Sequence, residues 1–138
     1  MKAKKSLGQN FLSNTNILSK IVDKSEILNS DIILEIGPGT GNLTKELMKK
    51  NPKKIIVVEK DNNLSKILIH KYGNKIHVIN NDILQCYKDF KDNKPIKVFG
   101  NLPYNISTQI LTSFIKLDNM EKILSNFTFI FQKEVADR

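Results

Sequence analysis

Residues 32–41, with the sequence IILEIGPGTG, decide the fold of this chain. Four of the first five side chains are apolar, which is typical of a strand buried on both faces of a parallel sheet. Three glycines follow at alternate positions from Gly37 to Gly41, and they indicate a strand-to-helix turn where the backbone approaches a ligand without a Cβ in the way. The stretch therefore predicts an α/β fold with a ligand-binding loop after a buried strand.

The sequence on either side alternates between short apolar runs and helical spacing of apolar residues. Asn51-Pro52 and Gly73 are expected to end two of the helices. We expect helices over residues 14–24, 43–50, 63–72 and 107–115, and strands over residues 32–36, 55–59, 76–80, 96–100 and 127–131. This progression predicts one domain with a parallel sheet and helices on both faces. A sheet that ends directly after its fifth strand is expected to be incomplete.

Composition narrows the class of protein and its surroundings. The formal net charge is +8, from 22 basic and 14 acidic residues, which favours a polyanionic partner; lysine-rich usage for solubility is the alternative. A lone cysteine, Cys86, argues against a disulfide framework or a structural zinc site and fits a reducing compartment. We find no membrane span and no secretory signal. We therefore expect a cytoplasmic protein that binds no metal ion and does not associate with a membrane.

The spacing of the glycine-rich loop bears on the cofactor. Gly37-x-Gly39-x-Gly41 closes the last interval of the dinucleotide pattern G-x-G-x-x-G, which favours a smaller, cationic nucleoside cofactor over NAD. Glu35, just before the loop, is expected to contact a backbone group or an ammonium group. A simple glycine-rich turn is the alternative interpretation.

Two further carboxylates follow neighbouring strands. Glu59 ends the second strand, where an acidic side chain accepts both ribose hydroxyls of a nucleoside; a salt bridge to Lys60 or a solvated strand end is the alternative. Asp82 follows the third strand and is placed to accept from the exocyclic amine of an adenine. An N-cap of a helix starting at Ile83 explains Asp82 equally well.

The motif at residues 101–104, NLPY, is the sharpest signal in the sequence. Pro103 restricts Leu102 to an extended conformation, which keeps carbonyl groups pointed away from a helix. The Asn101 side chain and a neighbouring carbonyl then accept the two hydrogens of an aromatic amine, and Tyr104 offers a ring on which the base stacks. A simple turn is the alternative. Because the motif follows a strand, it is expected to share one crevice with the glycine-rich loop.

Four motifs together carry a family resemblance: KSLGQNFL at residues 5–12, EIGPGTG at 35–41, NLPYNIS at 101–107 and QKEVADR at 132–138. In this order they resemble the ribosomal RNA adenine N6-dimethyltransferases, and more the branch that acts on small-subunit 16S RNA than the resistance enzymes that act on large-subunit RNA. The resemblance implies a Rossmann-like, S-adenosylmethionine-dependent methyltransferase sheet with helices on both faces, truncated after the fifth strand. It implies a basic arm over residues 1–13 that contributes to the cofactor site, a partial methyltransferase domain over 14–138, and an absent C-terminal helical domain.

The resemblance also implies a function. It implies N6-dimethylation of two adjacent adenosines in the 3′-terminal hairpin of 16S ribosomal RNA during small-subunit biogenesis, with S-adenosyl-L-methionine as methyl donor. The implied residues for the target amine are Asn101, Leu102, Pro103 and Tyr104. With the loop residues above, the implied cofactor contacts are Asn10, Leu12, Glu35, Gly37, Gly39, Gly41, Glu59, Asp82 and Asn101.

Family members continue past this point with further strands and a second aromatic stacking residue. We therefore expect a monomer that binds the cofactor weakly and transfers methyl groups poorly or not at all by itself. The alternative function is a non-catalytic RNA-binding or ribosome-assembly module that keeps the fold. An oxidoreductase with a nucleotide cofactor ranks third.

Overall fold

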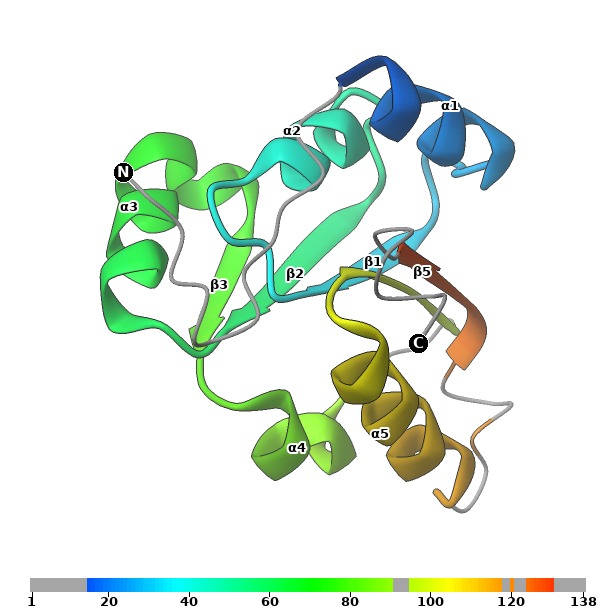
Figure 1. The fold of residues 1–138 in the computed structure, drawn as a ribbon. Helices are drawn as coiled ribbons and strands as arrows, with labels where there is room; N and C mark the ends of the chain where they lie inside the picture. The colour runs from blue at the N-terminus through cyan, green and yellow to red at the C-terminus, as the bar shows by residue number, and fades with distance from the viewer. Residues whose placement is uncertain (1–14, 91–94, 118–119, 121–123, 131–138) are drawn as a thin grey trace.

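The computed structural model describes residues 15–90, 95–117, 120 and 124–130 (Figure 1). Its strands are β1 (Ile32–Ile36), β2 (Lys54–Glu59), β3 (His77–Asn80), β4 (Ile96–Asn101) and β5 (Leu124–Ile130). They form one sheet in the order β3-β2-β1-β4-β5, and every neighbouring pair is parallel. The α/β class and the parallel sheet expected from the sequence are confirmed.

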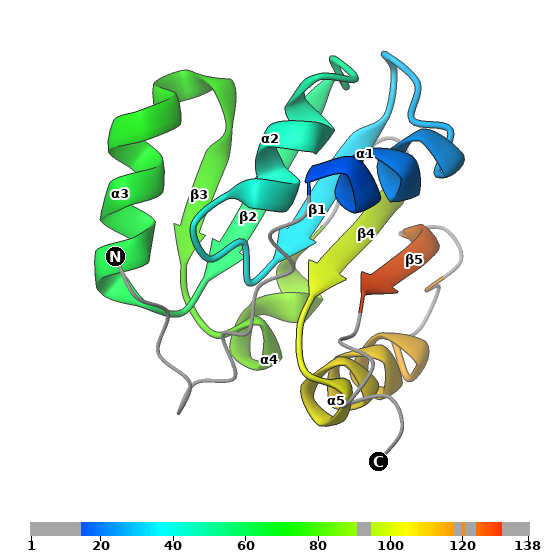
Figure 2. The same ribbon diagram turned by 45° about the horizontal axis from the view of Figure 1, so that its top comes forward.

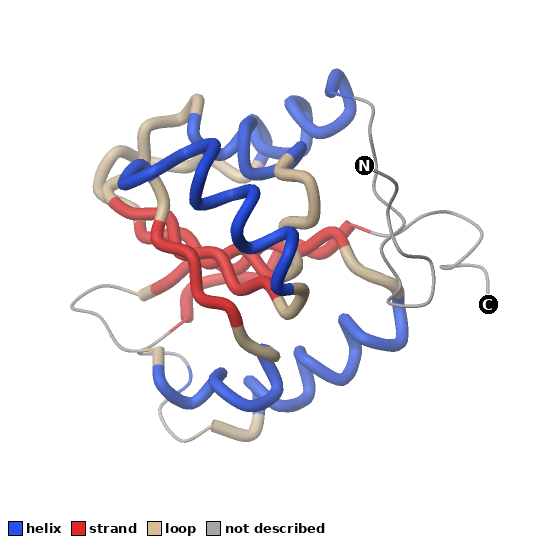
Figure 3. The backbone as a smooth tube through the Cα atoms, turned by 90° about the vertical axis from the view of Figure 1, so that its left-hand side faces the viewer, coloured by secondary structure: helices blue, strands red, loops and turns tan. Residues whose placement is uncertain are grey.

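Helices cover both faces of this sheet. The helices are α1 (Thr15–Lys24), α2 (Asn42–Met48), α3 (Asn62–Tyr72), α4 (Ile83–Cys86) and α5 (Tyr104–Ile115), with 3₁₀ turns η2 (Gly73–Lys75) and η3 (Tyr87–Asp89). Helices α1, α2 and α3 lie on one side and α4 and α5 on the other, with the sheet as the middle layer (Figures 2 and 3). None of the helices that the structure describes is long and apolar enough to span a membrane.

Alternation along the strands sends side chains into two hydrophobic cores. In β1, Ile32, Leu34 and Ile36 pack with α4 and α5, whereas Ile33 packs with α1, α2 and α3. The two cores lie on opposite faces of the sheet, so the central strands β1 and β2 are buried and apolar along almost their whole length. The run IILEI departs from this pattern at one position, Glu35, which faces the same layer as Ile33.

Several element boundaries differ from the sequence-based expectation. Helix α4 was indicated only by the N-cap interpretation of Asp82, because its four residues are too few to show a helical period. Helix α5 begins at Tyr104 rather than at 107, because Pro103 serves as its N-cap residue. Strand β5 begins at Leu124 rather than at 127, because its start is set by pairing with Ile96 of β4. The expected start of α1 at 14 and end of β5 at 131 lie outside the described residues.

The strand order reverses between β1 and β4. From β1 the sheet grows one way through β2 and β3, and the other way through β4 and β5. Ile36, the last residue of β1, lies opposite Gly100 in β4. Loops that leave the carboxyl ends of these two strands diverge at this point, and open α/β sheets bind ligands at such a crevice.

Candidate functional site

The glycine-rich loop leaves β1 at the switch point between β1 and β4. Gly37, Gly39 and Gly41 all have positive φ, at 65°, 60° and 94°, a conformation that residues with a Cβ rarely adopt. The Gly37 N–H donates to the Val58 carbonyl at 2.9 Å, and the Gly41 N–H donates to the Pro38 carbonyl at 3.0 Å. The loop is thus a tight turn that is tied to β2 and starts α2.

The loop packs directly against the NLPY motif. A Cβ added at Gly37 would lie 2.5 Å from Cδ2 of Leu102, so the glycine is needed for close approach as well as for its φ angle. A Cβ at Gly100 would also meet Leu102, at 3.4 Å. The two motifs, which are about sixty residues apart in the sequence, therefore contact each other in the fold, as the sequence predicted.

The NLPY motif joins β4 to α5. Asn101 is the last residue of β4, and Pro103 has φ −56° and ψ 149° and gives its carbonyl to the Ser107 N–H at 3.0 Å. Among the described residues, no hydrogen bond engages the Asn101 side chain or the Leu102 carbonyl. Within the described part of the chain, both oxygens therefore keep their acceptor capacity. Tyr104 starts α5 with about half of its surface exposed, at 49%.

Glu59 ties the glycine-rich loop to the end of β2. Its side chain is buried; Oε1 accepts the Gly39 N–H at 3.0 Å and Oε2 accepts the Asp61 N–H at 2.9 Å. Burial raises the pKa of Glu59 above its ordinary value, and these two N–H groups oppose that rise. The solvated strand end and the salt bridge to Lys60 are both wrong, because the carboxylate is buried on backbone donors. A carboxylate offers about four acceptor positions, so the group keeps acceptor capacity beyond its backbone donors.

Glu35 is placed differently. Its carboxyl group lies in the layer between β1 and α2, where Oε1 accepts the Thr44 hydroxyl at 2.5 Å. Oε2 has no hydrogen-bond partner among the described residues. Burial raises the pKa of Glu35 to about 8, against the effect of the Thr44 hydrogen bond, so the group is largely protonated at pH 7. The expected contact of Glu35 with a backbone group is replaced by this bond to Thr44, because strand alternation directs the side chain toward α2.

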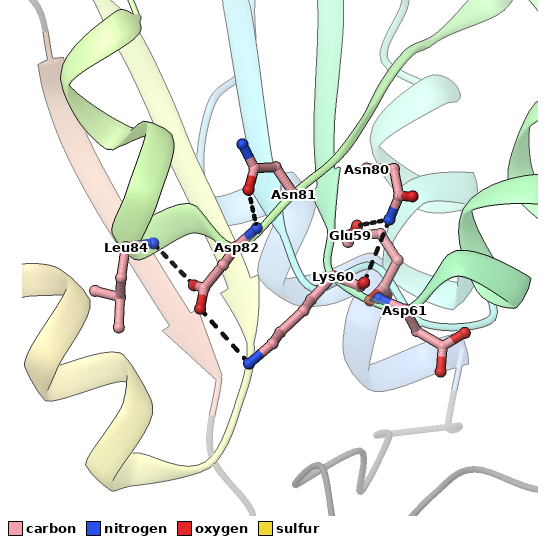
Figure 4. A network of polar contacts seen from close by, with 7 residues as sticks. All are labelled: Glu59, Lys60, Asp61, Asn80, Asn81, Asp82 and Leu84. Carbon is pink, nitrogen blue, oxygen red and sulfur yellow. Dashed lines mark hydrogen bonds and ion pairs between the residues drawn. The ribbon is translucent and has the colours of Figure 1, made fainter.

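Asp82 caps α4, as one of its two interpretations predicted. Its Oδ1 accepts the Leu84 N–H at 3.0 Å, and its Oδ2 lies 3.5 Å from Nζ of Lys60 (Figure 4). Asn80 donates through Nδ2 to the carbonyls of Glu59 and Lys60, at 3.0 and 3.3 Å. The carboxyl ends of β2 and β3 are thereby joined by polar contacts. The adenine contact of Asp82 stays a prediction.

Sequence reasoning missed three members of this region: Thr44, Lys60 as the partner of Asp82, and Asn80. Only Thr44 carried a signal, as a hydroxyl within the apolar face of a predicted helix. The predicted cofactor residues Asn10 and Leu12, and the motif at residues 132–138, lie outside the described residues. Within the described ranges, no three histidine, cysteine, aspartate or glutamate side chains gather as they would around a metal ion.

Comparisons with known proteins agree with this arrangement. The family model described as ribosomal RNA adenine dimethylase matches residues 1–138. The ribosomal RNA small subunit methyltransferase A of Pelagibacter ubique is 51% identical over 143 residues, covering 100% of this chain and 52% of that protein. The protein of the same name from the Wolbachia of Brugia malayi is 43% identical, covering 100% of this chain and 53% of that protein. The chain thus spans about half the length of these curated relatives.

Solved structures show the same fold. The 23S rRNA methyltransferase ErmE superposes with a TM-score of 0.75 at 29% identity, covering 92% of this chain and 50% of that chain. A dimethyladenosine transferase from Plasmodium falciparum superposes with a TM-score of 0.66 at 32% identity, covering 94% of this chain and 46% of that chain. The described sheet is therefore similar to the part of these methyltransferases that it covers.

Proposed function

Because this chain belongs to the ribosomal RNA adenine dimethylase family, we propose that it forms the cofactor-binding and amine-binding part of an rRNA adenine N6-dimethyltransferase. Its cofactor is S-adenosyl-L-methionine. Its substrates are two adjacent adenosines in the 3′-terminal hairpin of 16S ribosomal RNA, modified in the precursor of the small subunit. The names of its relatives and the basic charge of +8 support an RNA substrate.

One observation carries the proposal: Leu102 of the NLPY motif packs onto Gly37 of the glycine-rich loop. A cofactor held by the loop and an amine held by the motif are then neighbours, which a transfer between them requires. Holding two reactants together is a large part of what an enzyme supplies to such a reaction.

The residues present fit this cofactor. The three positive-φ glycines present backbone without a Cβ, and Glu59 keeps lone pairs for a hydroxyl pair at the end of β2. Asp82, two strands from the loop, keeps Oδ2 outside the helix cap for an amino group. We assign Glu59 to the ribose and Asp82 to the adenine of the cofactor. Asn10 and Leu12 of the arm at residues 1–13 complete the cofactor site in this proposal.

When bound, S-adenosylmethionine supplies an electrophilic methyl group on a sulfonium. The chain supplies the orientation and electronic state of the target amine. Asn101 Oδ1 and the Leu102 carbonyl each accept one hydrogen of the adenine amine, which turns the nitrogen lone pair out of conjugation with the ring and toward the loop. The exposed ring of Tyr104 stacks on the base, which must be splayed out of the RNA to reach this point. The chain acts as a monomer in the cytoplasm, and no three possible metal-ligating side chains gather among its described residues.

A single-turnover assay tests this proposal. The chain, in excess over an unmodified 16S hairpin RNA, is given S-adenosylmethionine carrying a labelled methyl group, and the digested RNA is analysed for N6-methylated adenosine. We expect slow transfer that Asn101→Ala lowers about 100-fold or more, because one of the two positioned acceptors is lost. Asn105→Ala, an exposed asparagine on α5, is the matched control and keeps the wild-type rate.

The same assay separates the alternative function. A chain that binds the hairpin and the cofactor without any transfer is a non-catalytic module that keeps the methyltransferase fold. The relatives are about twice as long as this chain, so the assay also tests whether the residues present are sufficient for methyl transfer.

A further inference from the structure

The pair formed by Lys60 and Asp82 lies at the carboxyl ends of β2 and β3. Lys60 directly follows Glu59, and its Nζ lies 3.5 Å from Oδ2 of Asp82 (Figure 4). These are the ends of the strands to which the proposed function assigns the nucleoside of the cofactor. A lysine ammonium is therefore bonded to the carboxylate that is proposed to read the base.

The backbones on both sides of this pair are fixed. The Asp82 N–H donates to Asn81 Oδ1 at 2.7 Å, and Asp82 Oδ1 accepts the Leu84 N–H at 3.0 Å. On the other side, the Lys60 carbonyl accepts from Asn80 Nδ2 at 3.3 Å. The approach of the two charged residues is thus a property of the fold, and only the flexible stem of Lys60 is free to adjust.

The two carboxylate oxygens of Asp82 have different partners. Oδ1 is bonded to the first turn of α4, which leaves Oδ2 as the oxygen that faces an incoming donor. The Lys60 side chain is 70% exposed and the Asp82 side chain 27%, so the ion pair is weak and a ligand can displace the ammonium. Lys60 and a ligand amine compete for one acceptor.

We propose that Lys60 competes with the 6-amino group of the cofactor's adenine for Oδ2 of Asp82, and thereby lowers the preference of this site for adenine over a 6-oxo base. This inference rests on the proposed function. A 6-amino group donates to Asp82, so Lys60 weakens its binding. A 6-oxo group accepts only, so it is repelled by Asp82 but accepts a hydrogen bond from the Lys60 ammonium, and the N1–H beside it is the donor that such a base offers to Asp82. Removing the ammonium therefore favours the 6-amino base over the 6-oxo base, which loses a hydrogen bond.

Two neutral ligands test this inference without a contribution from ligand charge. The 138-residue chain is titrated with 5′-methylthioadenosine and with 5′-methylthioinosine, and the dissociation constants are measured from NMR chemical shifts at low salt. We expect Lys60→Met to bind the adenosine compound about threefold more tightly and the inosine compound about threefold more weakly, as for loss of one exposed ion pair. The ratio of the two constants then changes about tenfold, and less at high salt.

Lys66→Met is the matched control, since Lys66 is an exposed lysine of α3 outside this network. It removes the same charge and leaves the ratio unchanged. Asp82→Asn is the second variant, because asparagine also caps helices well and its amide both donates and accepts. In that background we expect Lys60→Met to change the ratio less, because the competition for the carboxylate is gone and only the contact of the ammonium with the 6-oxo group is lost.

The outcomes distinguish a failure of the role of Lys60 from a failure of the proposed cofactor site. Saturable binding of 5′-methylthioadenosine with a ratio that Lys60→Met leaves unchanged, or shifts toward the inosine compound, overturns the role of Lys60 and leaves the cofactor site standing. A folded wild-type chain that binds neither compound overturns the proposed cofactor site and this inference with it.

Discussion

Glu35 and Glu59 are carboxylic acids in neighbouring strands of the sheet, and their hydrogen-bond partners give them different roles. Glu59 accepts two backbone N–H groups, one of them from the glycine-rich loop. Glu35 accepts a single hydroxyl, from Thr44, and the other oxygen has no partner among the described residues. Backbone donors favour the carboxylate form, whereas a nearly dry site favours the protonated acid. Glu59 is therefore suited to contact a ligand, and Glu35 to fill the layer under the loop.

The raised pKa of Glu35 makes the stability of the chain depend on pH. The pKa rises from its ordinary value of 4.5 to about 8 in the folded state. Between these values the folded chain holds a proton that the unfolded chain has lost, so the free energy of unfolding falls as pH rises, by up to about 1.4 kcal/mol per unit. Glu35→Gln keeps the acceptor for Thr44 and has no proton to lose. We expect the variant to gain stability relative to wild type as pH rises from the ordinary pKa of 4.5 to the folded-state pKa of about 8, and the difference to level off above that.

Urea unfolding of the wild type and of Glu35→Gln at several pH values measures the difference in their free energies of unfolding. The titration of all other groups is the same in both proteins and cancels in this difference. Glu46→Gln, a buried glutamate of α2 paired with Lys49, serves as a second glutamate variant for comparison. A difference between wild type and Glu35→Gln that does not change with pH contradicts the assignment of Glu35 as a protonated acid.

At this scale the sequence predicted residues whose role follows from local pattern. The glycines of the loop and Glu59 at a strand end were recognisable from spacing. The protonation of Glu35 was not, because it depends on α2 covering the strand, and the partner of Lys60 was not, because Asp82 approaches from the next strand. Both depend on tertiary neighbours that a single sequence does not display.

At the scale of the elements, the turn after β1 depends on Gly37 for two reasons, its φ of 65° and its contact with Leu102. Gly73 provides a control, because its φ is 56° and an added Cβ would meet nothing within 4 Å. We expect Gly73→Ala to cost about 1–3 kcal/mol of unfolding free energy from backbone strain alone, since its φ of 56° is combined with a ψ of −130°. Gly37→Ala is expected to cost its own backbone strain and, in addition, the displacement of the Leu102 side chain.

Thermal and urea unfolding of the two variants measure these costs. In the Gly37→Ala background, Leu102→Ala is expected to recover part of the loss, because it removes the side chain that the new Cβ meets. Equal costs at Gly37 and Gly73, with no coupling to Leu102, would show that the two motifs do not pack together in solution.

The elements themselves were predictable where a strand or helix is long and regular. The buried runs of β1, β2 and β4 and the helical spacing of α3 were found within about two residues of their ends. Helix α4 is a single turn after a capping residue, too short to show a period. The first residues of β5, Leu124 to Asn126, are not an apolar run, and their strand conformation comes from pairing with β4.

At the scale of the whole molecule, the proposed site and a structural ion pair lie at opposite ends of the sheet. The carboxyl end carries the proposed site. At the amino end of β4, Lys97 donates to Asp31 Oδ2 at 2.7 Å and to the Glu26 carbonyl at 3.2 Å. Both side chains of this ion pair are largely buried, at 15% and 17% exposed. The pair ties the segment between α1 and β1 to the sheet.

We expect Lys97→Met to lower the free energy of unfolding by about 1–3 kcal/mol, because it removes a hydrogen-bonded ion pair that is largely buried. The affinity for S-adenosylmethionine, measured well below the unfolding midpoint, is expected to stay unchanged. A loss of affinity equal to that of a site variant would show that stability and binding are not separated along the strands.

The central claim is that this fold holds S-adenosylmethionine at the switch point between β1 and β4. Calorimetric titration of S-adenosylmethionine into the chain tests it most directly, with Glu59→Gln as the site variant, Lys97→Met as the control at the other end of the sheet, and circular dichroism to show that each is folded. We predict saturable binding by the wild type and by Lys97→Met, and a loss of at least about tenfold in Glu59→Gln, which turns a hydroxyl-accepting carboxylate into an amide. A folded wild-type chain that does not bind, or a Glu59→Gln chain that binds as tightly as the wild type, would contradict the account.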